Sequence, residues 1–423
     1  MQVRQLKRAV REEYVEKLIL FVFCPFLSFL YSLRDAASRS SYMIYFLFGV
    51  ALCWSMDVNM SPDAYYNDLQ GIMERFRNFN MSWDELKVQV NEYFSFSGQS
   101  EKELYGVAMM WFTKQFTQNP HVYFALSAVV YLIFFLNCLK RITRAPHFDN
   151  SFYCLIILLL FVLPRDIITV QNPRYCTAMW MAVMGTFNYY LATKHRMWNV
   201  LWIAAAPLFH SGLWAYATIF IAGQVLTKLL NHKVIWWLYI ISIPFVFFSY
   251  DVISMLDIQS LPLPDNFKRW VSWYFNDEMF NKEIRGEGSS GFAWVGKTFV
   301  VLSKIMYVGI PFILVKYKDE IRGNKRLWQF LWFFILYAAV VNFMQAIPVL
   351  GYRSYFVTRI LSMYFWIIMV YPRNNKYLLY ILAACSWEIF SRYFYKGAVN
   401  SCVPKIFFIE PLPAIIFDYW GAL

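Results

Sequence analysis

The sequence predicts an all-α fold, a polytopic integral membrane protein with about twelve transmembrane helices. Apolar residues make up 59% of the 423-residue chain, charged residues make up 16%, and the mean hydropathy is +0.40. This composition is typical of a protein that dissolves in lipid. The apolar residues also come in blocks of roughly 16 to 22, which is the length that a helix needs to cross a bilayer.

Lipid offers backbone groups no hydrogen-bond partner, so each spanning block must form a helix that satisfies its own N–H and C=O groups. We expect a single transmembrane domain over residues 1–423, with long loops at 57–120 and 251–297. The predicted crossings lie at 18–33, 41–56, 121–139, 152–164, 175–192, 197–211, 213–227, 234–250, 298–315, 327–345, 355–371 and 377–393.

Clusters of Lys and Arg in the short loops set the predicted orientation. They all fall on one side if 197–227 is a hairpin that turns near His210, and the positive-inside rule makes that side cytoplasmic. The two long loops then face outward. One long tilted helix over 197–227, with Pro207 inside it, is the alternative, and it would invert everything after it. The clusters are Lys140, Arg141 and Arg144; Lys194 and Arg196; Lys228 and Lys233; Lys316, Lys318, Arg322, Lys325 and Arg326; and Arg373 and Lys376.

The N-terminal tail is also basic, although strict alternation of the crossings would place it outside. We therefore expect 1–33 to contain a cytoplasmic amphipathic helix and a re-entrant or tilted first segment.

The long loops are expected to hold amphipathic helices at the membrane surface. Apolar side chains recur at helical spacing through 62–79, and the aromatic stretch 267–280 in the second loop is also amphipathic. Ser82 and Glu85 form a capping box that starts another helix in the first loop. The predicted apolar face of that helix carries Trp83, Leu86, Val90 and Phe94.

Several other classes of protein are disfavoured by the sequence. The formal net charge is +12, but the basic residues form no stripe interleaved with stacking aromatics, so we expect no nucleic-acid partner. The seven cysteines include no CxxC pair, so we expect neither a disulfide framework nor a metal site. We also expect no cofactor. HExxH, GxSxG and HxxxxD motifs are absent, and the glycines of RGEGSSG lack the Lys-Ser/Thr of a phosphate loop.

Arg174 is the most informative candidate for a binding residue. In QNPRYCTAMWM, Asn172 can cap a helix and Pro173 suits its first turn, so Arg174 lies at a helix N-terminus at the outward mouth of the membrane. An N-terminus carries partial positive charge, so an arginine there is electrostatically misplaced unless an anion such as pyrophosphate lies between them. The alternative is an arginine that reaches lipid headgroups.

Three further arginines extend this pattern. Arg353, in GYRSYF, stands at the outward start of another helix, and Arg359 lies almost two turns deeper in the same segment. A guanidinium at that depth costs at least about 2.5 to 3.5 kcal/mol, so it would face a wet cavity or pair with a carboxylate such as Glu388. Arg165 ends the 152–164 helix, where a cation is electrostatically ordinary.

Three residues are candidates for moving a proton. His210, in PLFHSG, lies at the proposed outward turn, where an imidazole can exchange a proton or donate to a phosphate oxygen, although a lone histidine is more often structural. Asp63, in SPDAYY, follows the second crossing; Ser61, Pro62 and Asp63 also make a good helix start with no catalytic role. Glu103, in EKELYG, is similarly ambiguous.

A set of outward arginines with one histidine and a few acids suits stabilisation of a phosphate leaving group better than covalent catalysis. The segments SPDAYYNDL, ELYGVAMMWFTKQF, QNPRYCTAMW, KHRMWNVLWIAAAPLFHSG and YRSYF occur in this order across apolar helices between about residues 41 and 400. In this order and spacing the chain resembles the EpsG family of Wzy-like exopolysaccharide polymerases, which also relates it to O-antigen polymerases. Tyr66, in the first of these segments, is a further candidate site residue. The resemblance is also compatible with a GT-C-like glycosyltransferase architecture for the helix bundle.

The resemblance implies an enzyme of the bacterial cytoplasmic membrane whose site faces the exterior. A growing glycan would leave one undecaprenyl pyrophosphate and join the non-reducing sugar of another lipid-linked repeat. Arg174 and Arg353 would clamp the departing pyrophosphate, and Arg359 and Arg165 would tune the cavity or hold the second lipid. Asp63 or His210 would deprotonate the attacking hydroxyl, and no metal is required.

The implied partners are lipid-linked oligosaccharides, membrane lipids, and a chain-length regulator and a flippase of the same pathway. Two alternatives remain open on the sequence. An O-antigen ligase-like transferase would move a finished glycan to a different acceptor through similar arginines. A lipid-linked oligosaccharide flippase or other transporter would be built from repeats with cation sites at mid-membrane, and the sequence shows no such repeat.

Overall fold

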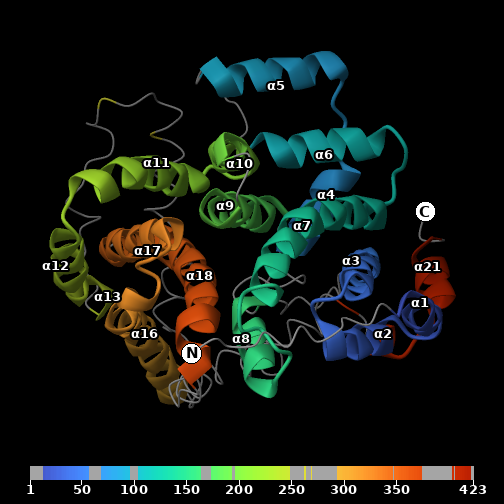
Figure 1. Cartoon of the computed structure of the whole chain (residues 1–423). Coiled ribbons are helices and arrows are strands. Elements are labelled where there is room, and N and C mark those ends of the chain that lie inside the picture. The colour runs from blue at the N-terminus through green and yellow to red at the C-terminus, as the bar shows by residue number, and fades with distance from the viewer. Residues whose placement is uncertain are drawn as a thin grey trace.

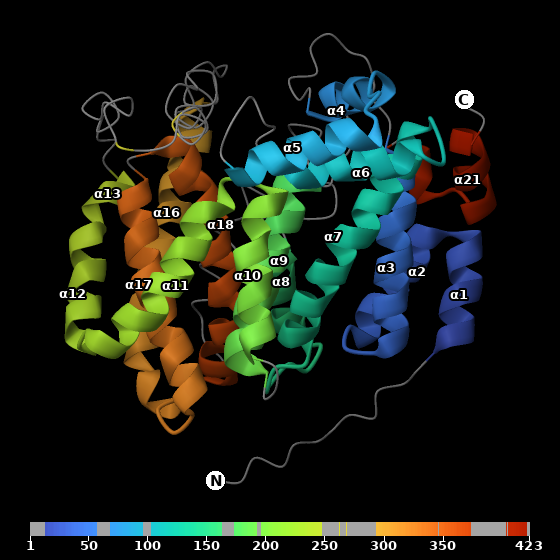
Figure 2. The ribbon, with the colours of Figure 1, turned by 90° about the horizontal axis from the view of Figure 1, so that it is seen from above.

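The computed structural model describes residues 13–56, 68–95, 103–162, 173–192, 196–247, 293–345, 347–373 and 405–420, together with residues 262, 268 and 403. Within these residues every regular element is a helix and no strand occurs, which confirms the all-α part of the predicted fold class. Most of the long helices run side by side through the body of the molecule, and a few shorter ones lie across one end of it (Figures 1 and 2).

The principal helices of the N-terminal part are α1 (Tyr14–Phe23), α2 (Pro25–Ser32), α3 (Arg39–Trp54), α4 (Asp68–Arg77), α5 (Trp83–Ser95), α6 (Leu104–Lys114), α7 (Pro120–Thr143) and α8 (Phe152–Val162). The principal helices that follow are α9 (Pro173–Leu191), α10 (Arg196–Phe209), α11 (Leu213–Leu229), α12 (His232–Ser242), α13 (Pro244–Phe247), α16 (Ala293–Lys316), α17 (Lys325–Met344), α18 (Pro348–Phe365) and α21 (Leu412–Trp420). A π turn and a 3-10 turn extend α18 to Arg373.

Three described helical segments are long and apolar enough to cross a membrane: α7, α17 and Leu350–Arg373. Shorter apolar helices lie at Phe152–Val162, Met197–Phe209, Leu213–Leu229 and His232–Phe247. These segments support a membrane protein, and the number of twelve crossings stays a prediction. The predicted crossing at 377–393 lies outside the described residues, and a helix occupies each of the other predicted blocks.

Two of the predicted apolar blocks are not continuous helices. The block 18–33 is divided into α1 and α2 at Pro25, and the block 234–250 is divided into α12 and α13 at Pro244. Proline has no N–H to donate, and its ring clashes with the preceding turn, so each helix ends before it. The division of 18–33 agrees with the expectation that the first segment is not a simple crossing.

The segment 197–227 is a helical hairpin rather than one long tilted helix. Helix α10 ends at Phe209 and α11 begins at Leu213, so the break falls at His210 as predicted. A backbone hydrogen bond of 3.0 Å from the Leu213 N–H to the His210 carbonyl closes the turn. The hairpin therefore brings His210 to one end of the bundle.

We call the opposite end, where α7, α9 and α11 finish and α17 begins, the cationic end (Figure 2). Contacts between the helix ends establish this grouping. The Arg141 Nε donates to Asn188 Oδ1 at 2.9 Å, Arg326 donates to the carbonyl of Ala192, and Arg373 forms an ion pair with Glu320. The described residues of the Lys/Arg clusters thus lie at one end, as predicted, and the assignment of this end to the cytoplasm stays a prediction.

Helices α4, α5 and α6 lie across the other end (Figure 2). The predicted capping box of α5 is formed: the Ser82 backbone N–H donates to Glu85 Oε2 at 2.7 Å and the Glu85 N–H donates to Ser82 Oγ at 3.2 Å. These hydrogen bonds lower the pKa of the Glu85 carboxyl. Helix α4 buries the apolar face that its spacing predicts, at Leu69, Ile72, Met73 and Phe76.

The buried face of α5 differs from the predicted one. Leu86 and Tyr93, two turns apart, are buried, whereas Trp83 and Phe94 are 53% and 58% exposed. The Tyr93 hydroxyl donates to the Pro207 carbonyl of α10 at 3.2 Å, and this contact sets which face of α5 docks. The two exposed aromatic rings suit a helix that lies in the headgroup layer of a membrane.

Close packing of α9 against α10 aligns the ends that carry Arg174 and His210. A Cβ at Gly185 of α9 would lie 2.6 Å from Ile203 Cγ1 and 2.8 Å from the Asn199 carbonyl oxygen of α10. Because these distances are shorter than van der Waals contact, only glycine allows the two helix axes to approach this closely.

Candidate functional site

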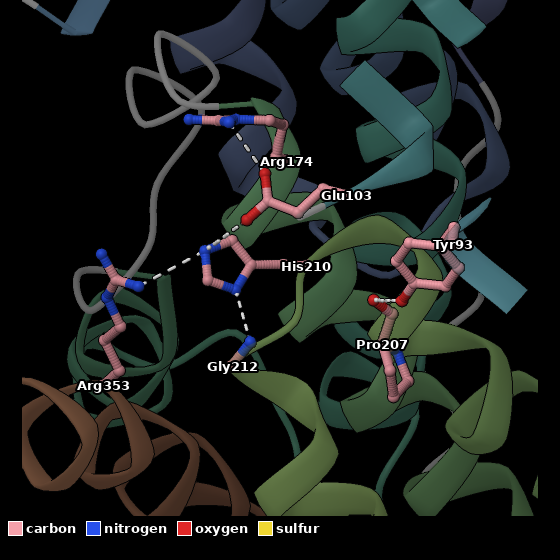
Figure 3. A network of polar contacts seen from close by, with 7 residues as sticks. All are labelled: Tyr93, Glu103, Arg174, Pro207, His210, Gly212 and Arg353. Atoms are coloured by element: carbon pink, nitrogen blue, oxygen red, sulfur yellow. Dashed lines mark hydrogen bonds and ion pairs between the residues drawn. The ribbon is translucent and has the colours of Figure 1, made fainter. Parts of the chain in front are cut away.

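Four side chains from separate elements meet where α6, α9, α18 and the α10–α11 turn come together (Figure 3). Glu103 is at the centre. Its Oε2 lies 2.8 Å from Arg174 Nη1, and its Oε1 lies 3.1 Å from His210 Nε2. Arg353 Nη1 lies 3.3 Å from the same histidine nitrogen. We call these four residues the Glu103 cluster.

Glu103 is positioned by the start of α6. It is the N-cap residue, with extended backbone angles, but its side chain makes no capping hydrogen bond to its own helix. The carboxylate instead extends toward α9 and the hairpin turn, and the residue is only 6% exposed. A buried carboxylate is stable only when it is paired. The Arg174 guanidinium and the His210 imidazole therefore compensate the burial of the Glu103 side chain.

Arg174 is the second residue of α9, and its side chain is 31% exposed. Its aliphatic stem passes over Gly106 of α6, where an added Cβ would lie 3.0 Å from Arg174 Cδ and 3.4 Å from Cγ. The glycine in the ELYG segment thus leaves the space through which the guanidinium reaches Glu103.

Substituting Gly106 tests this positioning. Gly106→Ala is expected to displace the Arg174 stem by a few tenths of an ångström and to lower activity severalfold, because catalytic groups tolerate little misplacement. Gly71→Ala is the matched control, since a Cβ at Gly71 of α4 meets nothing within 4 Å. Both variants would be compared for activity at equal protein levels. Equal activity of the two variants would contradict the proposed role of Gly106.

The protonation of His210 follows from its contacts. The Gly212 backbone N–H donates to Nδ1 at 3.0 Å, so Nδ1 carries no proton. The proton of the neutral ring is then on Nε2, within donation distance of Glu103 Oε1. A protonated Nε2 cannot accept a hydrogen bond, so its contact with Arg353 is a close approach of two donors. An anion placed beside them would stabilise this arrangement.

Tyr175 fixes the position of Arg353 relative to His210. Its hydroxyl donates to the Arg353 carbonyl at 2.9 Å, and the Arg353 Cζ lies 5.1 Å from its ring centroid. The same ring packs edge-on against the His210 imidazole, with centroids 5.1 Å apart. One aromatic side chain therefore joins the start of α9, the hairpin turn and α18.

The Glu103 cluster is electrostatically positive. It contains two guanidinium groups and one carboxylate, and the N-terminus of α9 adds further positive potential. This arrangement suits the binding of an anion with several oxygens, such as a phosphate or pyrophosphate. No group of three or more His, Cys, Asp or Glu side chains in the described part of the chain is arranged to hold a metal ion.

Among the described residues, Arg359 contacts aromatic rings of the bundle and lies deeper in α18 than Arg353. It is 2% exposed inside α18, and its Cζ lies 4.8 Å from the Tyr307 ring centroid and 5.9 Å from that of Phe356. These aromatic faces attract the guanidinium within the bundle. The predicted partner Glu388 lies outside the described residues.

The structure thus brings together Glu103, Arg174, His210 and Arg353 from the sequence-predicted candidates. Asp63, Tyr66, Arg165 and the capping residue Asn172 lie outside the described residues. Sequence reasoning missed Tyr175 and Gly106. Each lies inside a segment that the sequence analysis had already singled out, but neither carries a charge that would have marked it.

Comparison with known proteins was made with this geometry in hand. A family model described as "EpsG family" matches residues 77–404, which is most of the chain and includes all four residues of the Glu103 cluster. The chain belongs to the EpsG family. EpsG is a Wzy-like polymerase family, so this membrane protein is an exopolysaccharide polymerase-like protein. Searches of curated proteins and of solved structures found no match.

Proposed function

We propose that this EpsG-family protein polymerises oligosaccharide repeats that are linked to undecaprenyl pyrophosphate, on the outer face of the cytoplasmic membrane. One observation supports the proposal most directly. Arginines from two different helices, α9 and α18, converge on one buried His–Glu pair at the end of the bundle opposite the cationic end. If the cationic end faces the cytoplasm, the Glu103 cluster faces outward.

In the proposed reaction the bond between the anomeric carbon of the growing glycan and a pyrophosphate oxygen breaks, and that oxygen keeps the electron pair. Arg174 and Arg353 stabilise the charge that develops on the pyrophosphate. Guanidinium groups suit this role because each can donate two parallel hydrogen bonds to phosphate oxygens and stays charged at any working pH. Preorganised donors of this kind are worth about 10²- to 10³-fold in rate.

The acceptor is a sugar hydroxyl of a second lipid-linked repeat. Its oxygen forms the new bond to the anomeric carbon, and its proton passes to a base. Both ring nitrogens of His210 are engaged, Nδ1 with the Gly212 N–H and Nε2–H with Glu103, so we assign the proton to the Glu103 carboxylate, which His210 positions. Asp63, outside the described residues, is the other candidate base.

Reconstitution of the full-length protein into vesicles with purified lipid-linked repeats tests the proposal. A ladder of products longer than one repeat, with release of undecaprenyl pyrophosphate, is the expected result. Glycan transfer to a different acceptor without a ladder would favour the ligase-like alternative. Movement of intact lipid-linked repeats across the bilayer without any transfer would favour the flippase alternative, and either outcome would overturn the polymerase proposal.

A further inference from the structure

A cavity of about 370 Å³ lies at the cationic end, among α9, α11, α12 and α17. Three of its lining residues are cationic: Lys228 at the end of α11, and Lys325 and Arg326 at the start of α17. Thr227 and Gln329 add polar side chains, and none of the described lining residues is acidic. The cavity therefore selects for an anion.

The aromatic wall of the cavity is already packed against a protein ring. The His232 imidazole stacks on the Trp332 indole, with centroids 4.5 Å apart and planes 24° apart. It meets Trp328 edge-on, with centroids 5.3 Å apart. Because this stacking occupies a face of Trp332, the site is less suited to a nucleobase or a sugar ring than to a compact charged group.

The cavity is a separate site from the Glu103 cluster. Helix α9 begins beside Arg174 and ends at Leu191, and Arg326 donates to the carbonyl of Ala192 just beyond that end. Helix α11 likewise begins next to the hairpin turn and ends at the cavity. The length of the bundle therefore separates the two sites.

Apolar side chains on the outer surface of α11 lead up to the cavity. Val225, one turn before Lys228, is 53% exposed, and the adjacent Leu229 is 75% exposed. In a membrane protein such a surface contacts acyl chains. A soluble phosphate compound would make no use of it, so this surface favours a lipid as the source of the anion.

We propose that this cavity binds the phosphate headgroup of an anionic phospholipid, with the acyl chains lying along α11. Lys228, Lys325 and Arg326 hold the phosphate oxygens, and the polar side chains accept or donate to the rest of the headgroup. The volume of about 370 Å³ suits a headgroup and not a whole lipid. The inference is independent of the reaction proposed for the Glu103 cluster.

Native mass spectrometry of the full-length protein, titrated with phosphatidylglycerol or with phosphatidylcholine of the same acyl chains, tests the proposal. The wild-type protein is expected to bind one phosphatidylglycerol at least about tenfold more tightly than phosphatidylcholine. The double variant Lys228→Ala/Lys325→Ala is expected to lose that preference. Lys233→Ala/Arg322→Ala removes the same charge from exposed positions that do not line the cavity, and it should keep the preference.

Three results would overturn the inference. The first is a wild-type protein with no preference for phosphatidylglycerol, and the second is an equal loss of preference in both double variants, which would indicate only a general attraction of the cationic end. The third is displacement of the lipid by glycerol 3-phosphate at equal concentration, which would indicate a soluble phosphate ligand. A photoreactive phosphatidylglycerol that crosslinks to α11 and α17 of the wild-type protein keeps the test decisive if a variant fails to fold.

Discussion

Arg174→Ala is expected to abolish polymer formation, with a loss of about 10²- to 10³-fold, while single lipid-linked repeats accumulate on the outer face of the membrane. The substitution removes one of the two guanidinium groups that would hold the departing pyrophosphate, and it leaves the buried Glu103 with His210 and no guanidinium at Oε2. Gel analysis of glycans extracted from membranes measures the loss of polymer. A membrane-impermeant probe reports which face of the membrane carries the single lipid-linked repeats.

Two further variants make this result specific. Arg174→Lys keeps the charge, but an ammonium cannot form two parallel hydrogen bonds to a phosphate. This variant should therefore retain more activity than Arg174→Ala and less than the wild-type protein. Arg77→Ala removes an exposed arginine of α4 at the same end of the molecule and should leave polymer formation unchanged. Full activity in Arg174→Ala would exclude the proposed leaving-group role. Repeats trapped in the inner leaflet would point to a flippase.

Glu103→Gln is expected to have a second large effect, lowering the turnover of the enzyme by about 10²-fold or more. An amide can accept from only one neighbour, so either Arg174 Nη1 or His210 Nε2 would face another donor. Removing one partner of a buried charge pair typically costs about 3 to 5 kcal/mol. Turnover and substrate affinity should be measured separately, because a base or positioning residue changes turnover more than affinity.

Exposed Glu74 of α4 provides the control for Glu103. Glu74→Gln makes the same chemical change on the surface and should behave as the wild-type protein. Glu103→Asp keeps the charge with a shorter reach and should retain an intermediate turnover. If Glu103→Gln polymerises normally, then the His210–Glu103 pair does not carry the proton, and Asp63 becomes the leading candidate base.

The helices were predictable because the lipid environment imposes a simple rule on the sequence. Long apolar blocks must be helical in a bilayer, and the cationic residues between them collect at one end. The breaks at Pro25 and Pro244 fall where a proline marks a possible helix end, but Pro207 and Pro311 lie inside α10 and α16, so a proline alone does not fix where a helix breaks. The exposed faces of α5 were not predictable, because the contact of Tyr93 with Pro207 depends on how two distant segments pack.

The site was predictable in part for a similar reason. Arg174 and Arg353 were identified because a cation at an outward helix start conflicts with the helix dipole, which is a property of one segment. The pairing of Glu103 with both Arg174 and His210 joins three segments that are far apart in the chain, and no periodicity or motif encodes that pairing. Sequence reasoning could name Glu103 as a candidate but could not give it a partner.

The hydrogen bond from Tyr93 to the Pro207 carbonyl links the surface helix α5 to the same turn of α10 that ends beside His210. The Tyr93 phenol therefore ties the placement of α5 to the turn that carries the His210 imidazole.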